Sequence, residues 1–255
     1  QRQMCIRDRT NDMVYHQARD DEIKLKVGKM DSIDKRFLDF IRSKKNNIVL
    51  DDMKDDFKKD DGSSSKMADY LLFNNDVILE QKLLTNDRTD LINEKINELA
   101  KTDEWLKRSW FGRVHIEELI QKHPDSDAFR KKIMDYAYRN IKDLVATSNR
   151  QIRATKESLN IPRAVGGLVI LNESIMPYES EYVMAELNFL VENPHYEHVD
   201  FVLYISELRR STHNIIDMSA MIKSSSPRYE FVNWYIKNVF SFDFASFFNH
   251  PIQFL

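Results

Sequence analysis

Two continuous apolar runs in the second half of the chain constrain its fold most strongly. Residues 164–173 read AVGGLVILNE and residues 199–206 read VDFVLYIS, and a helical pattern lies between them at about 178–191. A run without polar alternation is typical of a strand that is covered on both faces, as parallel strands under helices are. The order strand, helix, strand therefore predicts an α/β fold whose sheet is flanked by helices.

A β-hairpin is predicted upstream, where residues 66–84 read KMADYLLFNNDVILEQKLL. The two adjacent asparagines suit a two-residue turn, because Asn tolerates positive φ. If both asparagines form the loop, Asp69 lies opposite Glu80; if the loop is shifted by one residue, Asp69 faces Lys82. Side chains alternate along a strand, so either loop places all three charged residues on one face of the hairpin.

The other patterns complete the expected order of elements. Residues 31–45 have apolar side chains at helical spacing, residues 46–50 fit a short strand, and residues 51–65 form a polar, charge-dense loop. Residues 88–160 are mostly helical in pattern. A helix, antiparallel strands, a long helical stretch and a strand–helix–strand unit together predict a mixed β-sheet.

The two ends of the chain differ from the rest. Residues 1–9, QRQMCIRDR, resemble translated sequencing adapter and are expected to be an artefact outside the fold. They contain the single cysteine, so residues 10–255 have no thiol for a disulfide or a zinc–thiolate site. Residues 211–255 are rich in aromatic side chains, and we expect a helical extension packed on the domain, or a surface for a homodimer or a protein partner.

Charge and hydropathy narrow the function classes. No apolar run approaches the roughly 20 residues of a membrane helix, so we expect a cytoplasmic protein with no membrane partner. The net charge of −3 does not by itself indicate a nucleic-acid binder. Residues 127–163, however, carry nine Lys or Arg against four Asp or Glu, and such a local basic surface can guide a polyanion. The alternative is an ordinary solvated helix surface.

Two carboxylates and a lysine on one face of a hairpin indicate metal-dependent chemistry. Asp69 and Glu80 would repel each other, and this repulsion grows as water is excluded. A divalent cation removes the penalty, because Mg²⁺ is typically held by one or two carboxylates plus waters. Lys82 can then hold or activate a water for hydrolysis of a phosphodiester. The alternative is a salt-bridged ladder on the solvent face, although apolar residues share that face.

The same stretch resembles a family motif. AD at 68–69, ten intervening residues and EQK at 80–82 are similar to the signature of the PD-(D/E)XK nuclease superfamily. The resemblance implies a restriction-endonuclease-like fold with an α-β-β-β-α-β core over residues 10–210, carrying a helical insert at about 88–160. Ala68 stands where the family has proline.

The resemblance assigns a role to each residue of the motif. It implies Mg²⁺, or Mn²⁺, bound by Asp69, Glu80 and the backbone carbonyl of Gln81, with Lys82 orienting the attacking water. The implied function is a metal-dependent nuclease that hydrolyses phosphodiester bonds, with DNA as the expected substrate. Two alternatives stay open: a nuclease-like module that binds a protein without catalysis, and an α/β scaffold unrelated to nucleases.

Two further positions follow from the resemblance. Many members have an acidic metal ligand on the first helix, and Asp34 is the best match, with Asp31 and Asp39 as alternatives. Many also have a polar residue that faces the site from the helix before the next strand. Gln151 is the candidate here, with Lys156 as the second choice. An acid-x-Lys triplet is weakly specific, since the chain has three others, so the prediction depends on the flanking apolar strands.

Overall fold

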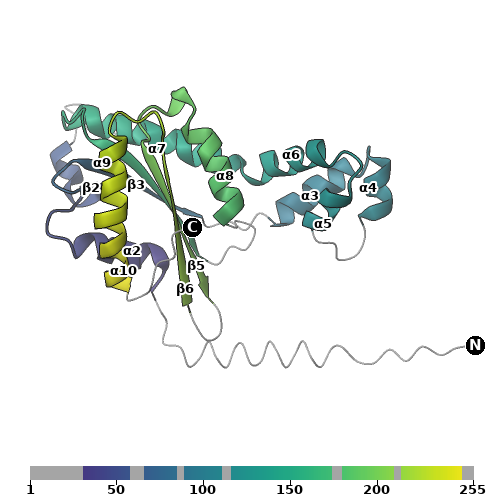
Figure 1. The fold of residues 1–255 in the computed structure, drawn as a ribbon, viewed down its shortest axis with the longest axis horizontal. Helices are drawn as coiled ribbons and strands as arrows, with labels where there is room; N and C mark the ends of the chain where they lie inside the picture. The colour runs from purple at the N-terminus through teal and green to yellow at the C-terminus, as the bar shows by residue number, and fades with distance from the viewer. Residues whose placement is uncertain are drawn as a thin grey trace, which may run out of the picture.

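The computed structural model describes residues 31–57, 66–84, 89–110, 116–173, 180–209 and 214–248. In these ranges the chain has an α/β fold with one six-stranded mixed sheet, flanked by helices (Figure 1). The strands follow one another across the sheet in chain order: β1 (Ile48–Val49), β2 (Tyr70–Leu72), β3 (Val77–Leu84), β4 (Val165–Glu173), β5 (Phe201–Arg209) and β6 (Asn214–Ile222). The segment 1–9, expected to be adapter-derived, lies outside the described residues.

The parallel centre of the sheet lies where the apolar runs predict it. β3, β4 and β5 pair in parallel, and the other neighbouring strands are antiparallel. Every residue of β4 is buried except Glu173, which explains the absence of polar alternation in this strand. A Cβ at Gly166 would lie 2.0 Å from the carbonyl oxygen of His198, so glycine is required there by a close backbone approach. The two predicted buried strands are confirmed.

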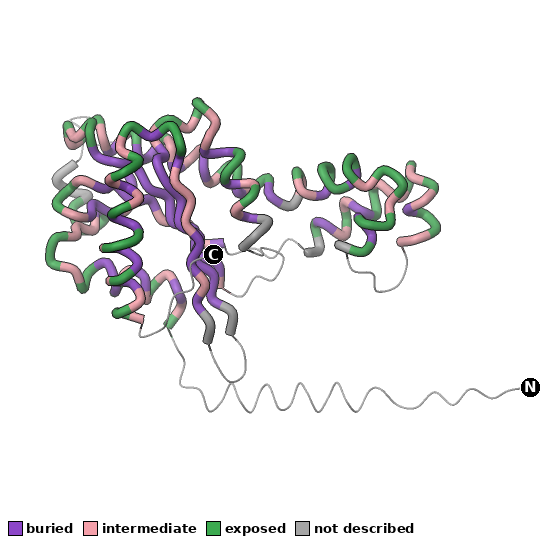
Figure 2. The backbone as a smooth tube through the Cα atoms, viewed as in Figure 1, coloured by how far each residue is buried: buried purple, intermediate pink, exposed green. Residues whose placement is uncertain are grey.

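Helices cover both faces of the sheet. One layer consists of α2 (Ile33–Arg42), α9 (Tyr229–Tyr235), the π-helical turn η3 (Ile236–Phe240) and α10 (Ser241–Phe248). The other layer contains α7 (Arg139–Ser158) and α8 (Ser180–Val191). Leu79 of β3 packs on the first layer and its neighbour Ile78 on the second, as expected for a strand between two layers. Figure 2 shows the strands as mostly buried between exposed helix surfaces.

The helices before α7 form a smaller group that projects from one side of the sheet (Figure 1). They are α3 (Thr89–Leu99), α4 (Glu104–Ser109), α5 (Ile116–Lys122) and α6 (Ser126–Ala137). His123 connects the N-terminal ends of α6 and α4. Its Nδ1 accepts the N–H of Asp125, the N-cap of α6, at 3.0 Å. Its Nε2 therefore carries the proton and donates to Asp103, the N-cap of α4, also at 3.0 Å. This group has its own polar contacts and occupies the predicted helical insert together with α7.

The turn of the hairpin is longer than the predicted two residues. The loop between β2 and β3 consists of residues 73–76, and its first three residues all have positive φ. The ring of Phe73 lies 5.5 Å from that of Tyr235 on α9, a tertiary contact that offsets this strained backbone. The loop has an even number of residues and keeps the first predicted register, in which Asp69 lies opposite Glu80.

The C-terminal segment contributes to the sheet as well as covering it. β6 lies within residues 211–255, which the sequence assigns to an extension, and it pairs antiparallel with β5. Its sequence, NIIDMSAMI, alternates imperfectly, so periodicity alone does not select a strand. Further along, Phe244 of α10 is fully buried with its ring 5.3 Å from that of Phe40. None of the described helices is long and apolar enough to cross a membrane.

Candidate active site

The hairpin brings the three predicted charged residues to one place. Asp69 immediately precedes β2 and continues its register opposite Glu80 of β3. Glu80 is fully buried and shares the α7 face of the sheet with Ile78. Lys82 lies two residues further along that face, and its Nζ pairs with Glu80 Oε1. A salt-bridged ladder on the solvent face does not fit this burial.

The buried face of helix α7 supplies a fourth polar side chain. Gln151 Oε1 accepts a hydrogen bond from Lys82 Nζ at 3.0 Å. Its Nε2 donates to the carbonyl of Met67 at 3.0 Å, so one amide holds both the lysine and the segment that leads into β2. Lys156, the second choice, lies elsewhere: its Nζ is 3.9 Å from a carboxylate oxygen of Asp200. The structure thus brings Gln151 to the cluster and leaves Lys156 outside it.

Thr155, one turn further along α7, is a site residue that sequence reasoning missed. Its Oγ1 accepts the backbone N–H of Ala68 at 2.8 Å and donates to the carbonyl of Gln151 at 2.8 Å. Spacing by four residues places both side chains on one helix face, which is the signal the sequence does contain. A proline at position 68, as in the family motif, would have no N–H to donate. We call the contacts of Gln151 and Thr155 with residues 67–68 the α7 clamp.

Asp69 makes a backbone contact that organises the edge of β3. Its Oδ2 accepts the N–H of Gln81 at 2.7 Å, because β2 begins only at Tyr70 and offers no strand partner there. A residue in an antiparallel ladder directs its N–H and its C=O at the same neighbour. The Gln81 carbonyl therefore faces the same edge as Asp69. The Gln81 side chain accepts the Tyr70 hydroxyl proton at 2.7 Å.

Burial makes the two carboxyl groups reluctant to ionise together. Burial, and then the charge of Asp69, raise the pKa of Glu80 to about 8, although Lys82 opposes the shift. Burial likewise raises the pKa of Asp69. Glu80 Oε2 is inaccessible to water and accepts no hydrogen bond from the described residues. Protonation would allow this oxygen to donate to Asp69, so near neutral pH the pair holds a proton unless a cation replaces it.

The donor set of this cluster fits a hard divalent cation. Its oxygens are the two carboxylates and the Gln81 carbonyl, which matches the one or two carboxylates plus waters that typically hold Mg²⁺. The buried Oε2 of Glu80 has no hydrogen-bond donor among the described residues, and a cation would supply the missing partner. Within the described residues there is no group of three or more His, Cys, Asp or Glu side chains arranged to hold a metal ion. Any cation here depends on the carbonyl and on water.

The acidic residue expected on the first helix does not join the cluster. Asp34 lies on α2, and α2 packs on the face of the sheet opposite to Glu80. Of the two alternatives, Asp31 pairs with Lys35 at 2.8 Å on the surface, and Asp39 is exposed. None of these three carboxylates forms a hydrogen bond or an ion pair with the described site residues. The apolar stripe of α2 decides this, because it orients the helix on the far side.

A different acidic residue lies beside the cluster. The 3-10 helix η1 (Leu50–Phe57) begins next to it, where the N–H of Leu50 donates to the carbonyl of Asp69 at 2.9 Å. Burial is the largest cause of the raised pKa of Asp69, and the charge of Asp51 adds to it. The sequence predicts only a polar loop over 51–65, so it gives Asp51 no role. This carboxylate increases the negative potential at the cluster.

The cluster combines two carboxylates, a lysine, an amide and a backbone carbonyl in a largely buried position. Such a set can bind a hard divalent cation and hold a water molecule next to it. Comparison of the chain with protein-family models, with curated proteins and with solved structures finds no match.

Proposed function

We propose that this chain is a cytoplasmic, metal-dependent nuclease of the PD-(D/E)XK type that hydrolyses phosphodiester bonds of DNA. The observation that carries the proposal is that half-buried Asp69 lies opposite buried Glu80, with Lys82 held between Glu80 and Gln151. The element order α2, β1, β2, β3, α7, β4 also corresponds to the α-β-β-β-α-β core, and this supports a restriction-endonuclease-like fold.

Each residue of the cluster has a role in this proposal. Asp69, Glu80 and the Gln81 carbonyl would hold Mg²⁺ or Mn²⁺, which supplies positive charge against the negative charge that develops on the phosphate oxygens. Lys82 would hold the attacking water by hydrogen bonding, and Gln151 would fix the direction of the lysine side chain. A lysine between a carboxylate and an amide has two of its three donors engaged, which leaves one for the water.

Cation binding would also offset the repulsion between the carboxylates of Asp69 and Glu80. Glu80 has a pKa of about 8, so at neutral pH it is largely protonated when no cation is present. Ligation requires the carboxylate, so binding of Mg²⁺ or Mn²⁺ would release a proton. The buried pair is therefore poised to exchange a proton for a metal ion, which a merely structural ion pair does not need.

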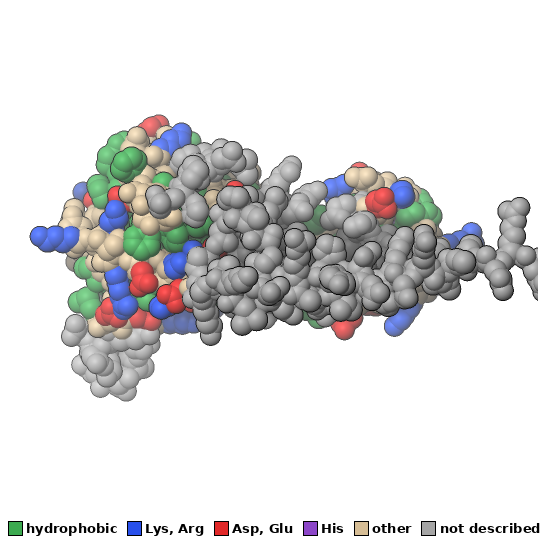
Figure 3. Space-filling view, turned by 90° about the horizontal axis from the view of Figure 1, so that it is seen from below, with side chains coloured by type: hydrophobic (Ala, Val, Ile, Leu, Met, Phe, Trp, Pro, Cys, Tyr) green, Lys and Arg blue, Asp and Glu red, His purple; other side chains and the backbone are tan. Residues whose placement is uncertain are grey.

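Surface charge supports a polyanionic substrate near α7. Seven basic side chains of α6 and α7 are exposed: Arg130, Lys131, Lys132, Arg139, Lys142, Arg150 and Arg153. Four acidic side chains of the same helices are exposed: Asp127, Asp135, Asp143 and Glu157. The excess of basic charge thus lies on the helix that supplies Gln151 and on its neighbour. On the face in Figure 3, basic and acidic side chains are intermixed over the described part. The distribution of charge therefore does not favour DNA binding on that face.

Cleavage assays with matched variants test the proposal. Duplex DNA, single-stranded DNA and RNA are incubated with Mg²⁺, with Mn²⁺ or with EDTA. We expect cation-dependent cleavage that falls by about 100-fold or more in Glu80→Gln and Lys82→Ala, because each removes a group that acts on the reacting atoms. Glu98→Gln and Lys95→Ala are the controls, since they break a surface pair of the same chemistry at 2.8 Å on α3.

Melting measurements separate the metal site from the chemistry. Mn²⁺ should raise the Tm of the unaltered protein and not that of Glu80→Gln, because a ligand that binds only the folded state stabilises it. Absence of cleavage for all three polymers, together with no effect of Mn²⁺ on Tm, would refute both the activity and the metal site. Equal cleavage by Glu80→Gln and by the unaltered protein would refute the assigned role of Glu80.

Exposed aromatic side chains favour a second candidate function. Trp234, Phe242 and Phe247 of α9 and α10 are 46%, 73% and 40% exposed. A nuclease-like module that binds a protein partner, or a second copy of itself, without catalysis would use such a surface. It predicts no cleavage in any of the assays above and a molar mass that changes on Phe242→Ser, which light scattering would detect for self-association.

A further inference from the structure

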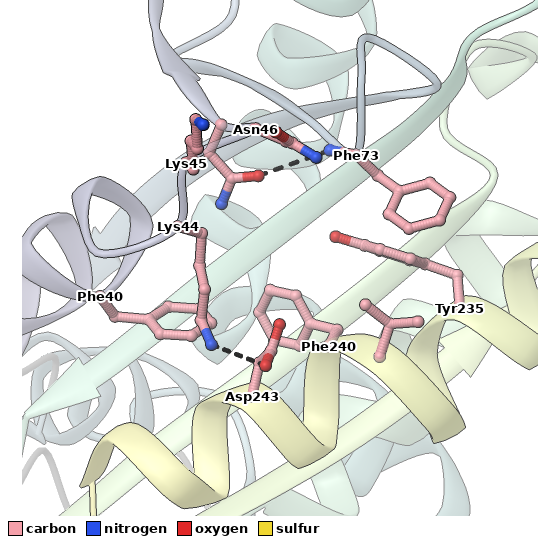
Figure 4. Close-up of a pocket in the computed structure, with 10 residues that line it drawn as sticks. Phe40, Lys44, Lys45, Asn46, Phe73, Tyr235, Phe240 and Asp243 are labelled. Carbon is pink, nitrogen blue, oxygen red and sulfur yellow. Dashed lines mark hydrogen bonds and ion pairs between the residues drawn. The ribbon is translucent and has the colours of Figure 1, made fainter.

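A cavity of about 380 Å³ lies on the opposite side of the sheet from Glu80, between the hairpin loop, the end of α2 and the C-terminal helices (Figure 4). Its apolar walls are formed by Phe40, Phe73, Tyr235, Val239 and Phe240. Its polar lining consists of Lys44, Lys45, Asn46, Asn47 and Asp243. A cavity of this size that combines apolar walls with polar groups suits a small molecule that has both an apolar and a polar part.

The hydroxyl of Tyr235 is the polar group that points most clearly to a ligand. Tyr235 is only 4% exposed, and its hydroxyl makes no hydrogen bond with any described residue. Figure 4 shows this oxygen directed into the cavity, away from the helix that carries the ring. Burial raises the pKa of Tyr235, so the group keeps its proton and remains a donor. The oxygen is not one of the fully buried atoms that lack a partner, so water can reach it in the cavity, and a ligand acceptor would take the place of that water.

The other polar groups of the cavity divide into occupied and unoccupied ones. Lys44 Nζ pairs with Asp243 at 2.6 Å (Figure 4). Asn47 is also engaged, because its Nδ2 donates to a carbonyl of α2 and its Oδ1 accepts the N–H of the first loop residue. Lys45 and Asn46 have no partner among the described residues. Three lining groups are thus unengaged: the ammonium group of Lys45, the amide of Asn46 and the hydroxyl of Tyr235.

We propose that this cavity binds a planar aromatic anion of nucleotide size, a nucleoside monophosphate. Aromatic walls provide ring faces and edges against which a base packs. The hydroxyl of Tyr235 and the amide of Asn46 are suited to the polar edge of a base, and Lys45 is suited to the phosphate. The paired Lys44 and Asp243 cancel each other in charge, so Lys45 gives the cavity a net positive charge that selects an anion.

This site does not rest on the proposed nuclease activity. The cavity shares no lining residue with the cluster around Glu80, and the two lie on opposite faces of the sheet. A nucleotide bound here could be a regulator or a nucleotide of a polymer, and the chemistry of recognition is the same. Binding can therefore be tested with a free nucleotide whether or not the chain cleaves DNA.

Calorimetric titration with adenosine 5′-monophosphate, adenosine and inorganic phosphate tests the proposal. We expect the monophosphate to bind more tightly than either fragment. Tyr235→Phe should weaken binding of the monophosphate and of adenosine by about threefold to tenfold, the effect of one neutral hydrogen bond. Lys45→Gln should weaken binding of the monophosphate and of inorganic phosphate by a few-fold that shrinks in high salt, and should leave binding of adenosine unchanged.

The control variants carry the same kinds of substitution at residues outside the cavity. Tyr229→Phe and Lys237→Gln alter an exposed tyrosine and an exposed lysine of the same C-terminal helices outside the cavity, and both should bind like the unaltered protein. Glu80→Gln should also bind like the unaltered protein. The proposal is overturned if no probe binds at millimolar concentration, if phosphate alone binds as tightly as the monophosphate, or if Glu80→Gln loses binding while Tyr235→Phe retains it.

Discussion

Removal of the hydroxyl of Thr155 tests whether the α7 clamp holds the candidate site together. Its bond with the N–H of Ala68 joins two residues that are 0% and 1% exposed. Thr155→Val keeps the shape of the side chain but leaves that N–H buried without an acceptor. Such a group costs about 1–3 kcal/mol, and 2 kcal/mol corresponds to roughly 4–8 °C in Tm for a chain of this size.

A double-mutant cycle isolates the bond from other effects of the substitution. Ala68→Pro removes the donor of the same bond, so the second substitution should cost less when the first is present. We expect a coupling free energy of about 1–2 kcal/mol between the two positions, measured by urea unfolding followed by circular dichroism. Thr155→Ser keeps the hydroxyl and serves as the control, with stability close to that of the unaltered protein.

The position of the clamp adds a readout beyond stability. Residues 67–68 lead directly into Asp69, so their release should weaken the effect of Mn²⁺ on Tm in Thr155→Val and not in Thr155→Ser. If the free energies of unfolding lost in the two single variants add up to the loss in the double variant within about 0.5 kcal/mol, the reasoning is refuted. Additivity would mean that the bond between Ala68 and Thr155 does not contribute to folding stability.

The remaining predictions concern pH and packing. The folded-state pKa of Glu80, about 8, lies above its ordinary value of 4.5. Its contribution to stability is therefore fully present below about pH 4.5 and is lost as the pH rises toward 8, by up to about 1.4 kcal/mol per pH unit. The Tm of the unaltered protein relative to Glu80→Gln should fall over this window, and a pH-independent difference would contradict the shift. Gly166→Ala should destabilise the fold by about 3 kcal/mol or more, since its Cβ would meet the carbonyl oxygen of His198 at 2.0 Å. Urea unfolding would measure this, and a near-neutral effect would show that the loop can move away.

Local periodicity determined much of the site before any packing was known. The alternation of side chains along residues 66–84 places Asp69, Glu80 and Lys82 on one face whichever even-numbered loop forms. The observed four-residue turn differs from the predicted one and still preserves this arrangement. The apolar runs likewise determined β4 and β5, because a strand buried on both faces cannot carry polar alternation. Gln151 came from a family resemblance rather than from spacing.

Only the tertiary structure decided which layers meet at that face. α7 covers Glu80 and α2 covers the opposite side, which leaves Asp34 away from the cluster and brings Thr155 to Ala68. The same packing places β6 at the edge of the sheet and encloses the cavity beside Tyr235. Burial then raises the pKa of Glu80. The physical reason is that side-chain direction within an element is set by the geometry of a few neighbouring residues. Pairing, burial and electrostatic environment depend on contacts between residues that are distant in the chain.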